Sequence, residues 1–446
     1  MRLTRRGIIS VRQCLNDKEI MKVPEGNIVL DHCRRSAFRS LKTNECRCAR
    51  VTAIIVAICA AMSPWAVSGQ GLGATGKPVR EFYISPNGSD SNSGTKAAPF
   101  LTFEKADSVV QSGATVHVLP GSYNGYTAQH TIRIASSGTK SARIRWVAET
   151  KWAARIVGHV NPANGLGWGI AIAGDYVDLI GFDVTSDANM GIWVLGTHVR
   201  VIGNHVHDIP GQPGCTEYGA SGVEQGNYSG GYMEVIGNVV HHIGAGGPGS
   251  CNKYQGIYLA APFDAAVNNI SYRNASKGIC TWHAATHNTI SNNTVFDNDI
   301  GILVGAGDSP CHRKCSADHM VVSNNIMYHN KTLGFWQYPK AGRQNIYSNN
   351  LAYANGVQNV LLQGLCGNAV APCNSFSKGI IADPQFVNPT GNFFTGDYHL
   401  KGISPALKAG TAIGAPAADF DGKSRPINSP PDLGAYESLQ QIAKTN

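Results

Sequence analysis

The sequence has little charge and lacks a long apolar run. Charged residues make up 15% of the 446 positions, while glycine occurs 51 times. A composition so rich in glycine disfavours helices, because each helical glycine costs about 1 kcal/mol relative to alanine. The longest uncharged apolar stretch, residues 51–62, is shorter than the roughly 20 residues that span a bilayer. These shortages favour an all-β protein without a membrane-spanning helix.

The apolar stretch has the features of a secretory signal peptide. Arg50 precedes it, and the small-x-small tripeptide Ala66-Val67-Ser68 follows it. We therefore expect residues 1–68 to be a leader, cleaved near Ser68, and the remainder to be secreted or periplasmic. Residues 69–446 contain 25 Lys and Arg against 24 Asp and Glu. Because the positive charge belongs to the leader, the composition gives no sign of a nucleic-acid-binding surface.

Seven of the twelve cysteines lie after the leader. Export permits disulfides, and position along the chain suggests three pairs. The predicted pairs are Cys215 with Cys251, Cys311 with Cys315, and Cys366 with Cys373. Cys280 is left over, and we interpret it as a packed thiol.

A short segment recurs through the second half of the chain. Examples are VIGNVVHHI at 235–243, TISNNTVFDN at 289–298 and IYSNNLAYAN at 346–355. A base period of roughly 22–25 residues with insertions is typical of a solenoid of short strands. One asparagine is in register throughout and predicts a hydrogen-bonded ladder: Asn204, Asn238, Asn269, Asn293, Asn325 and Asn350. Three residues later an aromatic column follows, in which we interpret the histidines as stacking residues: His207, His241, Tyr272, Phe296, Tyr328 and Tyr353.

A second register starts at glycine corners, as in GIWV at 191, GIYL at 256 and GILV at 301. Alternation along each strand then separates the two faces. The residues expected to face the core are Ile192, Val223, Ile257, Ile279, Ile302 and Phe335. Those expected on the outer face are Trp193, Glu224, Tyr258, Cys280, Leu303 and Trp336, with Trp282 and Tyr338 slightly further along. The pattern predicts an all-β, right-handed parallel β-helix of about nine or ten coils.

The chain resembles the secreted bacterial right-handed parallel β-helix repeat proteins of the pectate lyase-like superfamily. The motifs that carry the resemblance are FYISPNGSDSNSGTKAAPFLTFEKA at 82–106, KGICTWHAATHNTISNNTVF at 277–296, and GDYHLKGISPALKAG at 396–410 with PDLGAYE at 431–437. The resemblance implies an N-terminal strand and cap over 69–112 with a capping helix at 103–110. It also implies a β-helix over 113–400, and a last coil and cap over 401–446.

In such proteins a long-chain sugar usually lies along the outer strand face. The resemblance therefore implies a polysaccharide partner for a protein that we expect to be a monomer. Flat rings match the apolar faces of sugars. Trp193, Trp282, Trp336 and Tyr338 are accordingly the candidate substrate-binding residues.

Three functions stay open. A polysaccharide lyase acting on an acidic glycan needs a base and a group that neutralises the uronate carboxylate. The candidate catalytic residues are Glu224, His283, Lys253, Lys277 and Tyr258. A glycoside hydrolase would instead pair Glu224 with a second carboxylate from Asp208, Glu217 or Asp187. The third alternative is a non-catalytic envelope or glycan-binding protein.

Calcium is the candidate cofactor that the sequence suggests. It binds clustered carboxylate oxygens, and Asp208 and Glu217 are the candidate ligands. The dense aspartate cluster of calcium-dependent pectate lyases is missing, which weakens a direct assignment to pectate.

Overall fold

A computed structural model describes residues 80–124, 132–161, 166–211, 215, 219–244, 251–307, 316–339, 341–364 and 374–438. The predicted leader, Glu217 and the predicted pairs Cys311–Cys315 and Cys366–Cys373 lie outside the described residues. No helix among the described residues is long and apolar enough to cross a membrane.

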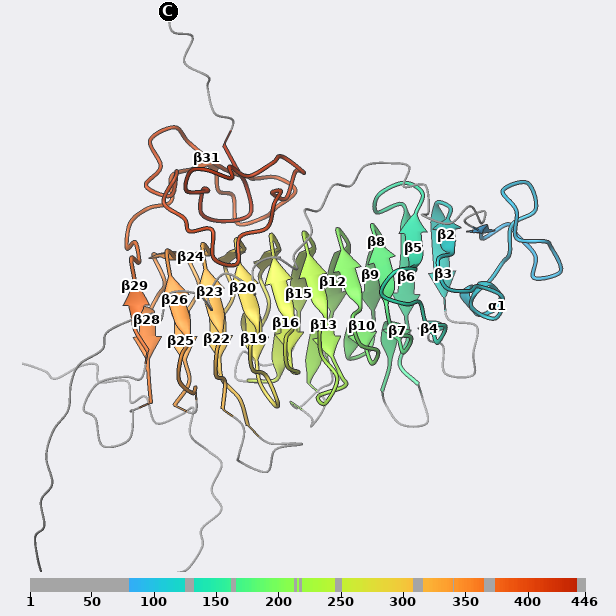
Figure 1. The fold of residues 1–446 in the computed structure, drawn as a ribbon, viewed down its shortest axis with the longest axis horizontal. Coiled ribbons are helices and arrows are strands. Elements are labelled where there is room, and N and C mark those ends of the chain that lie inside the picture. Colours follow the sequence, from blue (N-terminus) through green and yellow to red (C-terminus); the bar gives the residue numbers. More distant parts are fainter. Residues whose placement is uncertain are drawn as a thin grey trace, which may run out of the picture. The chain divides into compact units, whose positions relative to one another are not determined.

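The chain winds through three parallel sheets and forms a parallel β-helix, as the sequence predicted (Figure 1). The first sheet has eleven strands: β1 (Glu81–Ile84), β2 (Thr115–Val118), β5 (Ile144–Ala148), β8 (Val177–Ile180), β11 (Arg200–Ile202), β14 (Glu234–Ile236), β17 (Ala265–Val267), β20 (Thr289–Ser291), β23 (Val321–Ser323), β26 (Ile346–Ser348) and β29 (Phe376–Ser377). The second sheet has nine: β4 (Ile132–Ile134), β7 (Trp168–Ile172), β10 (Met190–Val194), β13 (Ala220–Gln225), β16 (Tyr254–Leu259), β19 (Lys277–Thr281), β22 (Ile300–Val304), β25 (Leu333–Gln337) and β28 (Gln358–Leu362). The third also has nine: β3 (Gly121–Asn124), β6 (Ala154–Gly158), β9 (Asp183–Ser186), β12 (His205–Ile209), β15 (Val239–Ile243), β18 (Ile270–Tyr272), β21 (Thr294–Phe296), β24 (Ile326–Tyr328) and β27 (Leu351–Tyr353).

The predicted asparagine ladder is present and fully buried. All six asparagines have no exposed surface. The Nδ2 of each of the first five donates to the Oδ1 of the asparagine one coil further on, as in Asn269 to Asn293 at 3.0 Å and Asn293 to Asn325 at 2.9 Å. From Asn238 onwards each Oδ1 also accepts the backbone N–H of the preceding ladder residue. The turn between the first and third sheets is thereby satisfied without water, which a buried polar turn requires.

A second ladder, which the sequence analysis missed, runs along the turn between the third and second sheets. Its members are Asn274, Asn298, Asn330 and Asn355, and it ends on Asn359 of β28; side-chain bonds of 2.9–3.1 Å join them.

Strand register in the second sheet agrees with the predicted faces. Ile192 pairs with Val223, which pairs with Ile257, and the inward column has no exposed surface. Trp193 pairs with Glu224, and Glu224 pairs with Tyr258, on the outer face. The column continues through Cys280, Leu303 and Trp336.

The N-terminal capping helix α1 (Phe103–Asp107) is shorter than the predicted 103–110. The Thr102 hydroxyl caps it by accepting from the Lys105 N–H. Phe103 stacks on Trp146 with ring centroids 5.3 Å apart, and both rings are buried. The helix thus covers the apolar interior at the N-terminal end of the stack.

The C-terminal segment does not form the expected last coil. Residues 401–438 contain no strand, and the last strands before them, β30 (Phe386–Asn388) and β31 (Asp397–Leu400), form an antiparallel pair outside the coils. In Figure 1 the segment lies along the side of the stack. Four asparagines in the left-handed conformation hold it there by donating to its carbonyls: Asn268 to Ala418, Asn292 to Asp432, Asn324 to Thr411 and Asn349 to Ala409.

Candidate functional site

The outer face of the second sheet carries the predicted aromatic strip. Trp193 is half-buried on β10 and packs against Trp168 at 4.8 Å between ring centroids. At the other end, Tyr338 contacts Trp282 at 4.9 Å and Trp336 at 5.4 Å. Three of the four predicted binding rings therefore form one group beside β22 and β25, and Trp193 stands apart.

Glu224 is the acidic residue of this face, on β13 between Trp193 and Tyr258. Its side chain is buried, with 5% of the residue exposed. Burial raises the pKa of the carboxyl to about 7, against the smaller opposing effect of a hydrogen bond with Ser221. A desolvated carboxylate is costly, so the neutral acid is favoured. Near neutral pH the group can therefore give or take a proton.

Two tyrosines near Glu224 contact the ring of His283. Tyr228 stacks on His283 with centroids 3.8 Å apart, and Tyr258 lies 5.7 Å from the same ring. Burial, followed by the charge of Glu224, raises the pKa of the Tyr228 phenol to about 12. The structure thus brings together three predicted catalytic residues, Glu224, Tyr258 and His283, and adds Tyr228. Tyr228 lies in a turn after β13, where no strand register predicts its position.

The two predicted lysines differ in their surroundings. Lys277 is buried on β19, and its ammonium donates to the carbonyl of Asn252. Lys253 is exposed just before β16. Cys280 lies on the same strand as Lys277, β19. It is a buried free thiol, as expected, and burial raises its pKa to about 11. The predicted disulfide between Cys215 and Cys251 is present.

Asp208 lies on the third sheet, away from the strand that carries Glu224. Its backbone adopts the left-handed conformation on β12, and its carboxylate accepts a hydrogen bond from Nδ1 of His207 at 2.8 Å. With Asp187 and His159 it lines a cavity of about 480 Å³. Asp208 and Asp187, the two described candidates for a second hydrolase carboxylate, therefore line this cavity and not the face that carries Glu224.

Among the described residues the candidate donors do not fit calcium, while Glu217, the other predicted ligand, lies outside them. Calcium takes six to eight oxygen ligands, with ionised carboxylates prominent among them. On the described outer face of the second sheet the predicted acid is Glu224, whose pKa of about 7 leaves it partly protonated. Asp208 has imidazoles as its neighbours, a donor type that suits transition metals better than calcium.

Comparison with known proteins places this geometry in context. A family model described as the Pel9A-like, right-handed β-helix region matches residues 82–368. The uncharacterized protein YwoF of Bacillus subtilis (strain 168) is 24% identical over 387 residues, covering 70% of this chain and 77% of YwoF. Pectate lyase L of Dickeya dadantii (strain 3937) is 30% identical over 125 residues, 27% of this chain and 29% of that protein. The crystal structure of pectate lyase Pel9A superposes with a TM-score of 0.56 at 22% identity, covering 80% of this chain and 96% of Pel9A.

Proposed function

The chain belongs to the Pel9A-like right-handed β-helix family, and on this basis we propose that it is a secreted enzyme that cleaves an acidic polysaccharide by β-elimination. The single observation that carries the proposal is the buried Glu224 carboxyl, with a pKa of about 7, beside Tyr258 and Tyr228, whose rings contact His283. The names of two similar proteins, pectate lyase L and pectate lyase Pel9A, agree with a uronate substrate.

The proposed substrate path follows the outer face of the second sheet across the strands. Neighbouring strands lie about 4.8 Å apart, a spacing close to the rise of a glycan per sugar. Trp193 on β10 and Trp336 on β25 are five strands apart in sheet order, or about 24 Å at that spacing. The face is therefore long enough for about five sugars. Glu224 is one strand from Trp193, so cleavage would occur towards that end of the bound chain.

The chemistry assigns a role to each member of the group. In β-elimination a base removes the proton next to the uronate carboxyl, the adjacent C–O bond breaks, and a double bond forms. Neutral Glu224 would donate a hydrogen bond to the substrate carboxylate and thereby lower the cost of the developing negative charge. A carboxylic acid kept neutral by an apolar site can act in this way. His283 would take the proton, and the Tyr258 phenol would protonate the leaving oxygen.

Two alternatives are supported by particular observations. A pKa of about 7 also suits the general acid of a glycoside hydrolase, which needs a second carboxylate across the bond. Glu217, outside the described residues, is the remaining candidate for that partner. The aromatic group around Tyr338 would serve a non-catalytic glycan-binding protein equally well.

The decisive experiment incubates the protein of residues 69–446 with a panel of uronate and neutral glycans. Ultraviolet absorbance of an unsaturated uronide identifies the lyase, and new reducing ends without that absorbance identify the hydrolase. Binding with no new ends would overturn both enzyme proposals. A parallel arm with EDTA and added calcium measures any dependence on the cation. N-terminal sequencing of the exported protein tests cleavage near Ser68.

Variants then separate the roles of the acid and the base. His283→Ala should slow turnover by roughly 100-fold or more, the usual contribution of a general base. Glu224→Ala should lose most activity, whereas Glu224→Gln should keep more, because an amide still donates to a carboxylate. A general acid of a hydrolase would lose activity in both variants. His329→Ala, in the turn after β24, is the matched control. Unchanged turnover in both Glu224→Ala and His283→Ala would show that the site is elsewhere.

A further inference from the structure

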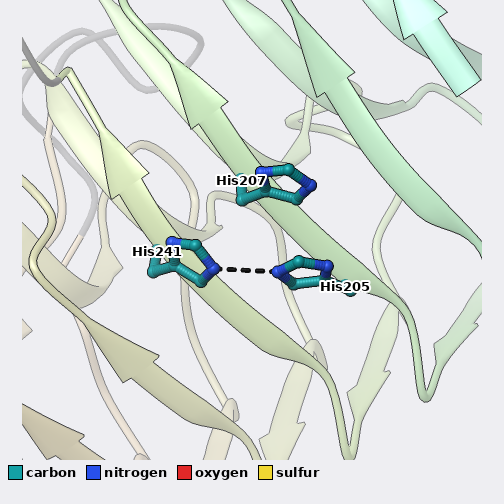
Figure 2. A group of neighbouring side chains, drawn as sticks. All are labelled: His205, His207 and His241. Carbon is teal, nitrogen blue, oxygen red and sulfur yellow. Dashed lines mark hydrogen bonds between the residues drawn. The ribbon is translucent and has the colours of Figure 1, made fainter. Parts of the chain in front are cut away.

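Three histidines meet on the outer face of the third sheet. His205 and His207 are two residues apart on β12 and so point to the same side, and His241 on β15 is the register partner of His207. One nitrogen from each ring lies within 4.8 Å of the others. Figure 2 shows the three rings gathered in this way, with Nε2 of His205 2.8 Å from Nε2 of His241. All three side chains are largely buried.

Two carboxylates orient the imidazoles. Asp183, the register partner of His205 on β9, has its Oδ1 2.7 Å from His205 Nδ1 and 2.9 Å from His207 Nε2. Asp208 accepts from His207 Nδ1. With Nδ1–H of His205 donated to Asp183, its Nε2 carries the lone pair that faces His241. A carboxylate that fixes the tautomer of a histidine in this way is the usual outer shell of a protein metal site.

We propose that His205, His207 and His241 form a binding site for a divalent transition metal ion such as Zn²⁺. The ion would replace the proton between the Nε2 atoms of His205 and His241. Tetrahedral zinc with Zn–N bonds of about 2.0–2.1 Å needs nitrogens roughly 3.3 Å apart, so these two rings would separate by about half an ångström. His207 would exchange its bond to Asp208 for a bond to the ion. The Asp208 side chain is 62% exposed and therefore has room to move or to become a fourth ligand.

Aromatic rings surround the cluster. Phe394, in the loop between β30 and β31, lies 4.9 Å from His205 and 6.0 Å from His241 in edge-on contact. Trp152 lies 5.4 Å from His205, and Tyr272 lies 4.7 Å from His241. An apolar surround limits access of water and strengthens the ion–ligand bonds. Because Phe394 belongs to the loop between β30 and β31, the proposed ion would also help to fix that loop.

A purely structural stack of rings is the competing explanation. In the next coils the His241 position holds Tyr272 and then Phe296, and the His205 position holds Val239 and then Ile270. These aromatic and aliphatic side chains pack in the same positions and need no carboxylate beside them. The same coils thus supply substitutions that keep the packing and remove the ligands, namely His241→Phe and His205→Val.

The test uses protein of residues 69–446 without a polyhistidine tag, freed of metal with EDTA. Titration calorimetry with Zn²⁺ should show one ion bound per chain, and Co²⁺ should give the visible absorption of a nitrogen-ligated, low-symmetry site. His241→Phe and His205→Val should abolish stoichiometric binding. Asp183→Asn should weaken binding by about 10–100-fold, as loss of an outer-shell carboxylate usually does. His329→Ala removes an exposed histidine that is bonded to Asp297 in the turns after β24 and β21, and this variant should bind as the wild type does.

Thermal melts keep the test conclusive if a variant is unstable. Zn²⁺ should raise the melting temperature of the wild type and of His329→Ala in proportion to the logarithm of its concentration, and leave that of folded His205→Val unchanged. No stoichiometric binding by the wild type, or unchanged binding by His241→Phe, would overturn the proposal. Glu224→Gln alters the outer face of the second sheet and should bind the ion normally. The metal-binding test therefore does not depend on the proposed glycan cleavage.

Discussion

The buried carboxyl of Glu224 makes a prediction about stability that can be worked out in full. Its pKa rises from 4.5 to about 7 because burial disfavours the ion. At about 1.36 kcal/mol per pKa unit, ionising the folded protein's Glu224 costs about 3 kcal/mol. Between pH 4.5 and about 7 the folded state holds a proton that the unfolded state has lost, so stability falls as pH rises through this window. Below it both states are protonated and the cost disappears.

Replacing Glu224 by glutamine removes that cost and keeps the shape of the side chain. We expect Glu224→Gln to stabilise the protein by about 3 kcal/mol at about pH 8 and to have little effect at about pH 4.5. Urea unfolding of both proteins at the two pH values measures the difference, and the comparison between variants cancels the other titrating groups. Exposed Glu81→Gln is the control for charge removal, with an expected effect within about 0.5 kcal/mol at both pH values. An equal effect of Glu224→Gln at the two pH values would refute the reasoning.

Three further predictions concern the scaffold. Asn293→Ala removes one rung of the ladder and leaves its buried hydrogen-bond partners unsatisfied, at about 1–3 kcal/mol each. The variant should lose roughly 3–5 kcal/mol of stability in urea unfolding. Replacing Cys215 and Cys251 by serine opens a loop with a sequence separation of 36 and should cost about 4 kcal/mol by the loop-entropy relation, measured against the oxidised wild type without reductant. Arg425→Ala leaves Glu437 buried without its 2.8 Å partner and should cost about 3–5 kcal/mol. Limited proteolysis should then cut the C-terminal segment first, and equal resistance to the wild type would contradict its anchoring role.

The fold was predictable because a β-helix repeats one environment many times. A buried turn that needs the same hydrogen bonds in every coil selects the same residue, so Asn204 and its five partners mark the period directly. The glycines expected at corners, such as Gly191 and Gly301, lie inside the strands, but the alternation that follows them still specifies which side chains point out. The second ladder was also visible, since Asn274, Asn298, Asn330 and Asn355 end segments of the same alignment, but only the first column was interpreted as a ladder.

The site was predictable only in part, because its properties depend on contacts between coils of unequal length. Register placed Glu224 between Trp193 and Tyr258, but its pKa depends on burial, which no periodic pattern specifies. Tyr228 reaches His283 from a turn outside the register.

The histidine cluster shows the same division between register and environment. The sequence placed His207 and His241 in one column, which the strand register confirms. The sequence did not indicate that Asp183 would lie opposite His205 and bond to the imidazoles of both His205 and His207. The carboxylate contacts, rather than the column itself, turn a stack of rings into a candidate metal site.

The C-terminal segment along the side of the stack changes how the coils depend on one another. In a simple solenoid each coil contacts only its neighbours, so unfolding can begin at one end and spread coil by coil. Here carbonyls of residues 409–432 hold turns of four different coils, from Asn268 to Asn349. Fraying of any one of these coils would break contacts that the others share. The segment therefore couples distant coils, and a chain cut before it should unfold in broader, stepwise transitions.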